Sequence, residues 1–202
     1  MERQQGKLIT FCGLDGAGKT SMINLCRDYF TEKGVDVVLT RQPTTEFRQR
    51  KDFRTFVDCG DFSPYDFKAL SLAAMADRLQ HVNKFIVPLI NEGKTVICDR
   101  YFFSCIVNHR AMGYVDDAWL YAITQEFVMP NLAFFLDIPV SVSVARVRQR
   151  LAEKNRMIDI NYQEKLRQEY LKIAEQFGGI VIASSEKEDN TFRKIIEFLD
   201  KL

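Results

Sequence analysis

The sequence predicts a single α/β domain of three layers, in which helices cover both faces of a five-stranded parallel sheet. Short apolar runs alternate with longer amphipathic segments along all 202 residues, which is typical of parallel strands joined by helical crossovers. That length is enough for one hydrophobic core, and no repeat, linker or low-complexity tract interrupts it. We therefore expect one domain over residues 1–202.

Five short apolar runs are the candidate strands, at residues 8–12, 35–40, 95–99, 132–137 and 180–183. Helical periodicity is found between them, near residues 19–33, 64–92, 117–127, 140–150, 162–177 and 191–202. Ser63, Pro64 and Asp66 form a favourable helix start, because they supply a hydroxyl cap, a proline at the first helical position and an acid in the first turn. Residues 44–63 are predicted to hold a partial amphipathic helix that is broken at residues 58–61.

The composition excludes several classes of protein. Lys and Arg number 28 against 27 Asp and Glu, so the formal charge of +1 gives no field that would hold a nucleic acid or an anionic membrane. No apolar run reaches the roughly 18–20 residues of a membrane span, and the first residues lack the apolar core of a signal peptide. We expect a cytoplasmic protein with neither nucleic-acid nor membrane partners. The five cysteines are scattered, which predicts reduced packing residues.

A glycine-rich loop lies between the first predicted strand and the first predicted helix. Residues 13–20 match G-x-x-x-x-G-K-[ST], in which backbone N–H groups surround a phosphate and the helix N-terminus adds its dipole. Lys19 is expected to reach the β- and γ-phosphates of ATP, and the Thr20 hydroxyl to bind Mg²⁺. An accidental glycine-rich turn is the alternative, and the flanking strand and helix argue against it. The fold is then that of a P-loop NTPase, with predicted ATP-binding residues Gly13, Asp15, Gly16, Ala17, Gly18, Lys19, Thr20 and Ser21.

Two arginines follow the second and third predicted strands, in Thr40-Arg41-Gln42-Pro43 and Asp99-Arg100-Tyr101. In a parallel sheet both strand ends open on the crevice beside the phosphate loop, where substrates bind. Arg41 and Arg100 are therefore expected to hold the phosphate of an acceptor. The Asn/Thr-Lys-x-Asp motif of GTPase switches is missing, as is an Asp-x-x-Gly outside the phosphate loop, which favours a small phosphotransferase.

At these motifs the chain resembles the thymidylate kinase family of nucleoside monophosphate kinases, over nearly its whole length. The phosphate loop matches, and so does Thr-Arg-Gln-Pro at 40–43, where the family pattern is Thr-Arg-Glu-Pro. Three further segments match: Ala-Asp-Arg-Leu-Gln-His at 76–81, Asp-Arg-Tyr at 99–101, and Pro-Asn-Leu at 130–132 followed by Phe-Phe-Leu-Asp at 134–137. The resemblance implies transfer of the ATP γ-phosphate, with Mg²⁺, to a nucleoside monophosphate, dTMP by default. It also implies a homodimer.

The same resemblance implies roles for individual residues. The arginines matching Arg41 and Arg100 bind the acceptor phosphate, and the aspartate matching Asp99 supports the metal. The acid matching Asp15 meets the acceptor sugar, and the arginine matching Arg78 faces the base.

The pattern of the predicted helix at residues 64–92 supports a ligand-facing Arg78 independently. An apolar stripe faces the core, and it consists of Leu72, Met75, Leu79, Val82, Ile86 and Leu89 or Ile90. A neighbouring stripe mixes small, charged and imidazole groups, namely Leu70, Ala74, Asp77, Arg78 and His81. The alternative is a solvated face that carries an Asp77–His81 pair. A binding face is favoured because this helix bridges two strands of the same crevice.

Seven cations and three acids lie between residues 146 and 167. Such a run is usually a solvated helix face, but here it follows the fourth predicted strand, where a closing lid brings positive charge over the phosphates. Members of the resembled family carry a catalytic arginine in the phosphate loop or in this lid, and the loop position here is Ala17. We therefore expect a lid near residues 148–160, with Arg156 as the first catalytic candidate, followed by Arg148 and Arg150. Asp159 is expected to help orient that arginine.

The departures from the family pattern fall in the acceptor pocket. Ala74 stands where the family carries an aromatic ring that stacks on the base, and Asn108 stands where a family tyrosine helps to exclude a 2′-hydroxyl. Ser104 is kept. Either the pocket accepts another base and sugar, or the changes are drift compensated by Phe102, Phe103 or Met75.

Two further functions stay open at this point. A nucleoside kinase acting on a free 5′-hydroxyl needs a carboxylate base near the end of the second strand, where this chain has Gln42. A non-catalytic nucleotide-binding module would not require Lys19, Thr20, Asp99 and Arg100 together.

Overall fold

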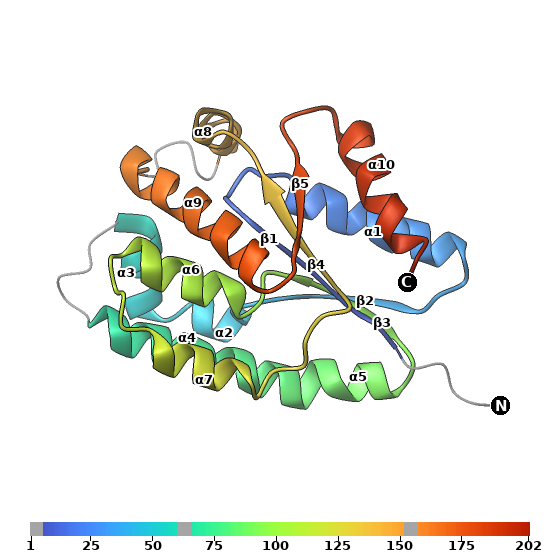
Figure 1. Cartoon of the computed structure of the whole chain (residues 1–202), viewed down its shortest axis with the longest axis horizontal. Coiled ribbons are helices and arrows are strands. Elements are labelled where there is room, and N and C mark those ends of the chain that lie inside the picture. The colour runs from blue at the N-terminus through green and yellow to red at the C-terminus, as the bar shows by residue number, and fades with distance from the viewer. Residues whose placement is uncertain (1–5, 60–65, 152–156) are drawn as a thin grey trace.

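The computed structural model describes residues 6–59, 66–151 and 157–202, with the side chains of residues 58 and 59 left aside. Its centre is a parallel sheet of five strands, β1 Leu8–Gly13, β2 Val37–Arg41, β3 Thr95–Asp99, β4 Leu132–Asp137 and β5 Ile180–Ala183 (Figure 1). The strand order is β2-β3-β1-β4-β5, with Phe11 of the central strand paired to Asp99 on one side and to Phe134 on the other. The predicted three-layer fold is confirmed.

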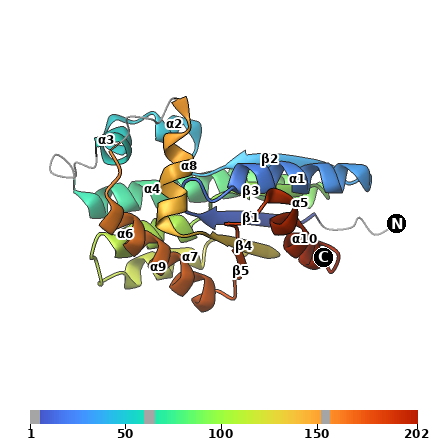
Figure 2. The same cartoon turned by 90° about the horizontal axis from the view of Figure 1, so that it is seen from above.

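Helices cover both faces of the sheet. They are α1 Lys19–Glu32, α2 Thr45–Arg48, α3 Lys51–Cys59, α4 Phe67–His81, the π-helical turn η1 Val82–Ile86, α5 Val87–Asn91, α6 Phe103–Ala111, α7 Ala118–Thr124, α8 Val140–Arg148, α9 Ile160–Gln176 and α10 Glu188–Leu199. The helices α1 and α10 pack together on one face, and α4, α5, α6 and α9 cover the other. Figure 2 shows α2, α3 and α8 at the end opposite the N-terminus, where β1 points. None of the described helices is both long and apolar enough to cross a membrane.

Two segments differ from the sequence prediction. The helix α6 was not predicted, because seven of its nine residues are buried and so leave no amphipathic period to detect. The long helix predicted at 64–92 is three segments, and it begins at Phe67 with Asp66 as its cap, while Ser63 and Pro64 lie outside the described residues. Pro88 has no N–H for the helical hydrogen bonds, and the π-helical turn ends two residues before it, at Ile86.

The buried face of α4 is rotated relative to the prediction. Leu72, expected in the core, is 51% exposed, whereas Ser71 and Ala74 are buried. The cause is α6, which packs against α4 and covers the stripe that carries Ala74 and Arg78. Because α6 was not predicted, the side of α4 that packs against it was not predicted to be buried.

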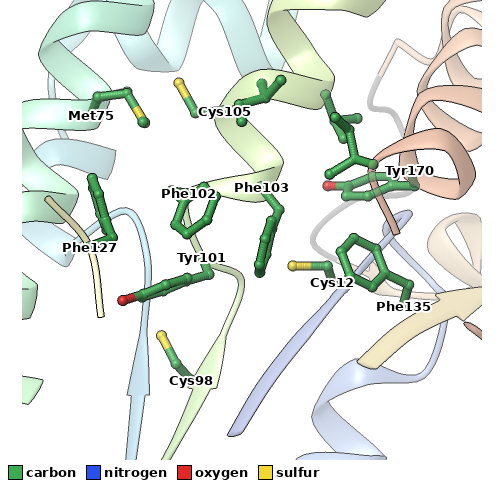
Figure 3. Close-up of a cluster of buried hydrophobic side chains, with 14 of the residues drawn as sticks. Cys12, Met75, Cys98, Tyr101, Phe102, Phe103, Cys105, Phe127, Phe135 and Tyr170 are labelled. Atoms are coloured by element: carbon green, nitrogen blue, oxygen red, sulfur yellow. The ribbon is translucent and has the colours of Figure 1, made fainter. Parts of the chain in front are cut away.

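The core between the sheet and α6 is rich in aromatic and sulfur-containing side chains (Figure 3). Cys12, Cys98 and Cys105 belong to it, and Cys26 lies in the core on the opposite face. All four cysteines are buried and free, as predicted. Burial raises the pKa of Cys12 to about 11 and that of Cys26 to about 12, so both are uncharged thiols.

Candidate active site

The phosphate loop runs from the end of β1 to the start of α1, and its glycines are required by the backbone. Gly13 has φ 134°, and a Cβ atom there would lie 2.4 Å from the carbonyl oxygen of Leu136 on the neighbouring strand. Gly16 has φ 81°, and its Cβ would meet the carbonyl oxygen of Ser143 at 2.7 Å. Side chains at these two positions would push β4 and α8 away from the loop. Thr20 and Ser21 follow in the first turn of α1, with Thr20 exposed to solvent.

Lys19 folds back over the loop. Its Nζ donates to the carbonyl oxygens of Gly13 at 3.2 Å and Leu14 at 2.8 Å. Burial lowers the pKa of Lys19 to about 8, and the positive charge of Arg100 adds to this, while Asp15 and Asp99 oppose it. The ammonium is therefore held by neutral acceptors, where a bound phosphate would stabilise its charge.

Asp99 lies at the end of β3, and its two carboxylate oxygens have different surroundings. Its Oδ2 lies 3.5 Å from Nε of Arg41, which ends the neighbouring strand β2. Its buried Oδ1 has no hydrogen-bond partner among the described residues. A buried carboxylate oxygen left unpaired is costly, and a cation or its water would satisfy it. Asp99 and the exposed hydroxyl of Thr20 thus fit a Mg²⁺ ion.

Arg100 connects β3 to the phosphate loop through a strained backbone. It has φ 68°, the only non-glycine residue with positive φ in the described chain, and its N–H donates to the Phe11 carbonyl at 2.8 Å. Its guanidinium donates to the carbonyl of Gly13 at 3.1 Å, to the Tyr170 hydroxyl at 2.7 Å and to Asp15 at 2.5 Å. This backbone conformation directs the Arg100 side chain to the phosphate loop.

A cavity of about 500 Å³ runs from the phosphate loop to the helices behind it. Gly13 and Asp15 line one end together with three arginines, Arg41, Arg48 and Arg100. Ala74, Arg78, Ser104 and Asn108 also line it, so every acceptor-binding residue predicted from the sequence faces one space. A phosphate at the arginine end and a base at the far end would occupy it together.

A second cavity, of about 230 Å³, lies on the other side of the phosphate loop. It is bordered by Gly16, Ala17, Gly18 and Ser21 of the loop and α1, by Arg146 and Arg150, and by residues of the β5–α10 connection, Ser184, Glu186, Glu188 and Thr191. The loop thus separates two spaces, and Arg150 borders both of them.

The helix α8 braces the phosphate loop, which the sequence did not reveal. Ser143 Oγ donates to the Asp15 carbonyl at 2.6 Å. Arg146 donates to the carbonyls of Gly16 at 3.2 Å and Ser184 at 3.1 Å. The only signal in the sequence was the cationic run, and it did not single out Arg146.

Asp77 and His81 of α4 form hydrogen bonds to residues at and after the end of β2. Asp77 accepts hydrogen bonds from the N–H of Thr44, at 2.9 Å, and from its hydroxyl, at 2.5 Å. His81 is bonded to the Thr40 hydroxyl at 2.9 Å and to the Gln42 amide at 3.1 Å. Asp77 and His81 are half-buried, they hold the end of β2 and the residues after it, and neither borders the 500 Å³ cavity.

The predicted lid arginines have different positions. Arg148 is exposed at the end of α8 and borders neither cavity, whereas Arg150 borders both. Arg156 lies outside the described residues. Asp159, expected to orient the lid arginine, instead caps α9 by accepting the N–H of Tyr162 at 3.1 Å. The assignment of residues 148–160 as a lid and the catalytic roles of Arg148 and Arg156 stay predictions.

Two tyrosines of α9 complete the wall opposite α4. The Tyr162 hydroxyl donates to Asn108 Oδ1 at 3.1 Å, and Asn108 in turn donates to the Ser104 carbonyl at 2.6 Å. The Tyr170 hydroxyl joins Ser104 Oγ, at 3.1 Å, to Arg100. These tyrosines and Arg48 were missed, because they lie more than 50 residues from Arg100 or Asn108 and belong to no motif.

Comparison with known proteins gives a consistent picture. A family model described as thymidylate kinase matches residues 11–195. A probable thymidylate kinase of Pyrococcus horikoshii is 38% identical over 92% of this chain and 92% of its own length. A thymidylate kinase of a Geobacillus species is 32% identical over 95% of each protein, and probable thymidylate kinase 1 of Saccharolobus solfataricus is 30% identical over 96% of this chain and 97% of its own. Together with the phosphate loop and the cavities on its two sides, these matches show that the chain belongs to the thymidylate kinase family and is an ATP-dependent phosphotransferase.

Proposed function

We propose that this enzyme transfers the γ-phosphate of Mg·ATP to the phosphate of a nucleoside monophosphate, with dTMP as the default acceptor. In this reaction an acceptor phosphate oxygen forms a bond to the γ-phosphorus, the bond to the bridging β–γ oxygen breaks, and ADP leaves. The observation that carries the proposal is the continuous cavity from the phosphate loop to Arg78, which has arginines at one end and room for a base at the other. A free nucleoside would leave the arginine end without an anion.

The donor phosphates would lie in the loop, with the adenosine in the second cavity beside Ser21 and Arg146. Lys19 would exchange its two carbonyl acceptors for the β- and γ-phosphates and neutralise charge that develops during transfer. Thr20 and Asp99 would hold Mg²⁺, which would supply positive charge to neutralise the phosphates. The unpaired Asp99 oxygen supports this assignment.

The acceptor phosphate would lie between Arg41 and Arg100, with Arg48 as a third cation. Arg48 is half-buried on α2, and burial together with the positive charges of Arg41 and Arg100 lowers its pKa. An acceptor phosphate among these three groups would relieve their mutual repulsion and make charge-assisted hydrogen bonds. Asp15, bound to Arg100, would face the sugar.

The final cation would come from the segment after α8. Arg150 is placed between the two cavities, where the γ-phosphate passes from donor to acceptor, and Arg148 and Arg156 are the other candidates. Closure of this segment would exclude water, which prevents the enzyme from hydrolysing ATP.

The homodimer and the cytoplasmic location stay predictions. Leu72 on α4 and Phe85 in η1 are 51% and 40% exposed, which supports a contact of this helical segment with a second copy. Light scattering after gel filtration tests the dimer.

A steady-state assay that couples ADP formation to an optical signal tests the proposed function. Turnover should require both ATP and a nucleoside monophosphate, and should be lost when Mg²⁺ is chelated. Thymidine should not replace dTMP. Phosphorylation of thymidine in preference to dTMP would contradict the proposal.

A further inference from the structure

Arg100 makes three hydrogen bonds that leave part of its guanidinium group available. Nη1 carries two hydrogens and donates to the carbonyl oxygen of Gly13 at 3.1 Å and to the hydroxyl of Tyr170 at 2.7 Å. Nη2 donates to Asp15 at 2.5 Å. Since a guanidinium has five N–H donors, Nε and one hydrogen of Nη2 have no partner in the part of the chain that the structure describes. These two donors are the ones that an acceptor phosphate can use.

The partners of Arg100 differ in how firmly they can hold it. Gly13 and Asp15 belong to the phosphate loop, and the Asp15 side chain is 38% exposed, so water weakens its ion pair with Arg100. Tyr170 is only 5% exposed, and it belongs to α9, outside the loop. A hydrogen bond is stronger in a buried site of low dielectric than in water. The Tyr170 hydroxyl is thus the buried contact that holds the guanidinium from outside the phosphate loop.

The hydrogen bonds around Tyr170 have a fixed direction. Arg100 can only donate, so the Tyr170 oxygen accepts from it. Burial raises the pKa of Tyr170, so the hydroxyl keeps its proton, which it donates to Ser104 Oγ at 3.1 Å. Ser104 Oγ in turn donates to Sγ of Cys12 on β1, at 3.9 Å. Because both its proton and its oxygen are engaged, the Tyr170 hydroxyl has one defined orientation.

The ring that carries this hydroxyl is fixed by the packing of α9. Tyr170 lies on the buried side of that helix with Leu166, Ile173 and Ala174, at the spacing of one helical face. Its ring meets Phe135 of β4 edge-on, with the two ring centroids 6.4 Å apart. Figure 3 shows the Tyr170 ring beside Phe135, with its hydroxyl on the side of α6. The sheet and α9 therefore determine where the hydroxyl lies.

Packing alone does not account for the hydroxyl. A phenylalanine would fill the same space and keep the edge-on contact with Phe135. A buried hydroxyl is costly unless it has hydrogen-bond partners, and here the partners are Ser104 and Arg100. The hydroxyl is explained by the charged group that it orients.

We propose that Tyr170 is a positioning residue for phosphoryl transfer, whose hydroxyl holds the Arg100 guanidinium so that its two free donors are presented to the acceptor phosphate. Tyr170 acts through Arg100 and takes no part in making or breaking bonds. The inference rests on the proposed function, because it assumes that Arg100 binds the acceptor phosphate. Without the hydroxyl, Arg100 would keep its bonds to the phosphate loop, but its guanidinium could rotate and would present both free donors less often.

The variant Tyr170→Phe tests this role, since it removes the hydroxyl and keeps the ring. The fold should persist, which a thermal melt checks. The kcat/KM for dTMP at saturating Mg·ATP should fall about tenfold or more, as expected for a lost hydrogen bond to a charged group. The KM for ATP should stay the same, because Tyr170 does not border the second cavity. An unchanged kcat/KM for dTMP in the folded variant would overturn the inference.

A double-mutant cycle separates the positioning of Arg100 from a general structural role. In Arg100→Asn there is no guanidinium left to orient, so the addition of Tyr170→Phe should lower the kcat/KM for dTMP by no more than about twofold. Such non-additivity is expected of two residues in one hydrogen-bond network. If Tyr170→Phe causes the same fold-loss with and without Arg100, Tyr170 acts independently of that arginine and the inference is overturned.

Tyr121→Phe is the matched control for loss of a hydroxyl that binds α9. The Tyr121 hydroxyl donates to Gln176 Oε1 at the end of that helix, at 2.9 Å, and Tyr121 borders neither cavity. This variant should leave the kcat/KM for dTMP unchanged. An equal fall in Tyr121→Phe and Tyr170→Phe would show that a loosened α9, rather than an unoriented Arg100, accounts for the change, and the inference would be overturned.

Failure of the inference and failure of the proposed function give different results. If the unmodified enzyme phosphorylates dTMP and Tyr170→Phe is equally active, only the positioning role is overturned. If the unmodified enzyme turns over neither dTMP nor any other nucleoside monophosphate, the proposed function is overturned and the inference with it.

Discussion

The two sides of the phosphate loop are built by different means. The donor side is made mainly by backbone, with glycines that allow the loop to turn and the first turn of α1 following directly. The acceptor side is made by side chains of α2, α3, α4, α6 and α9, which lie far apart in the sequence. A backbone site requires a fixed local sequence, whereas a side-chain site tolerates many combinations that give the same space. The residues that bind the phosphate donor can therefore be predicted from a sequence motif, whereas the residues that surround the acceptor are found only in the structure.

The largest effect is expected from the donor side. Lys19→Ala removes the ammonium that neutralises the transferring phosphate, so kcat should fall by about 10²–10³ or more. The folded state should persist, because the hydrogen bonds of Lys19 Nζ within the described part of the chain go to two carbonyl groups of its own loop. Steady-state kinetics together with a thermal melt measure both quantities. Turnover close to that of the unmodified enzyme in a folded variant would refute the phosphate-loop assignment.

The acceptor side should respond selectively to loss of its arginines. Arg41→Ala and Arg100→Asn should each raise the KM for dTMP by about 10- to 100-fold, as expected for lost charge-assisted hydrogen bonds, with a smaller change in the KM for ATP. Asparagine is used at position 100 because it tolerates the positive φ of that residue. Equal losses for both substrates would place these arginines on the donor side.

The extent of prediction from sequence follows the same division. The five strands and the order of the helices around them were predictable, because buried parallel strands are uniformly apolar and their crossover helices are amphipathic. The helix α6 was not predicted, because it is buried on nearly all sides and its sequence has no amphipathic period. Cys105 and Ala111 lie on that helix and border the 500 Å³ cavity, so their part of the cavity wall was not predicted, although Ala74 was.

A smaller effect on the donor side is expected from loss of the hydrogen bonds that Arg146 of α8 makes to the phosphate loop. Arg146→Ala removes the hydrogen bonds to the carbonyls of Gly16 and Ser184, which hold the loop against the β5–α10 connection. The KM for ATP should rise by about three- to tenfold, the equivalent of roughly 0.5–1.5 kcal/mol, and the KM for dTMP should stay the same. Arg146→Lys is the matched control, since it keeps the positive charge at this position but lacks the guanidinium that reaches both carbonyls. A KM for ATP that rises in Arg146→Ala and is unchanged in Arg146→Lys would show that charge alone, rather than the brace, accounts for the change.

The smallest expected effect is a loss of stability at acidic pH, caused by His81 on α4. Burial lowers the pKa of His81 from 6.5, although Asp77 and Glu46 oppose the shift. The unfolded chain therefore binds a proton more readily than the folded one at pH below about 6.5, so stability is highest above that pH and declines as the pH falls. His109, whose pKa burial also lowers, contributes in the same direction.

The melting temperature measured between about pH 7.5 and pH 5.5 tests this difference. His81→Gln should reduce the acid-induced drop by a few degrees, because a neutral amide can still bond to Thr40 and Gln42 without taking up a proton. The same measurement on His109→Gln gives the contribution of His109 to the drop in melting temperature. The KM for ATP should be the same in the unmodified enzyme and His81→Gln, since His81 borders neither the phosphate loop nor the second cavity. An unchanged acid response in His81→Gln would show that His81 binds a proton equally well in the folded and the unfolded chain, and that its bonds to Thr40 and Gln42 do not make stability depend on pH.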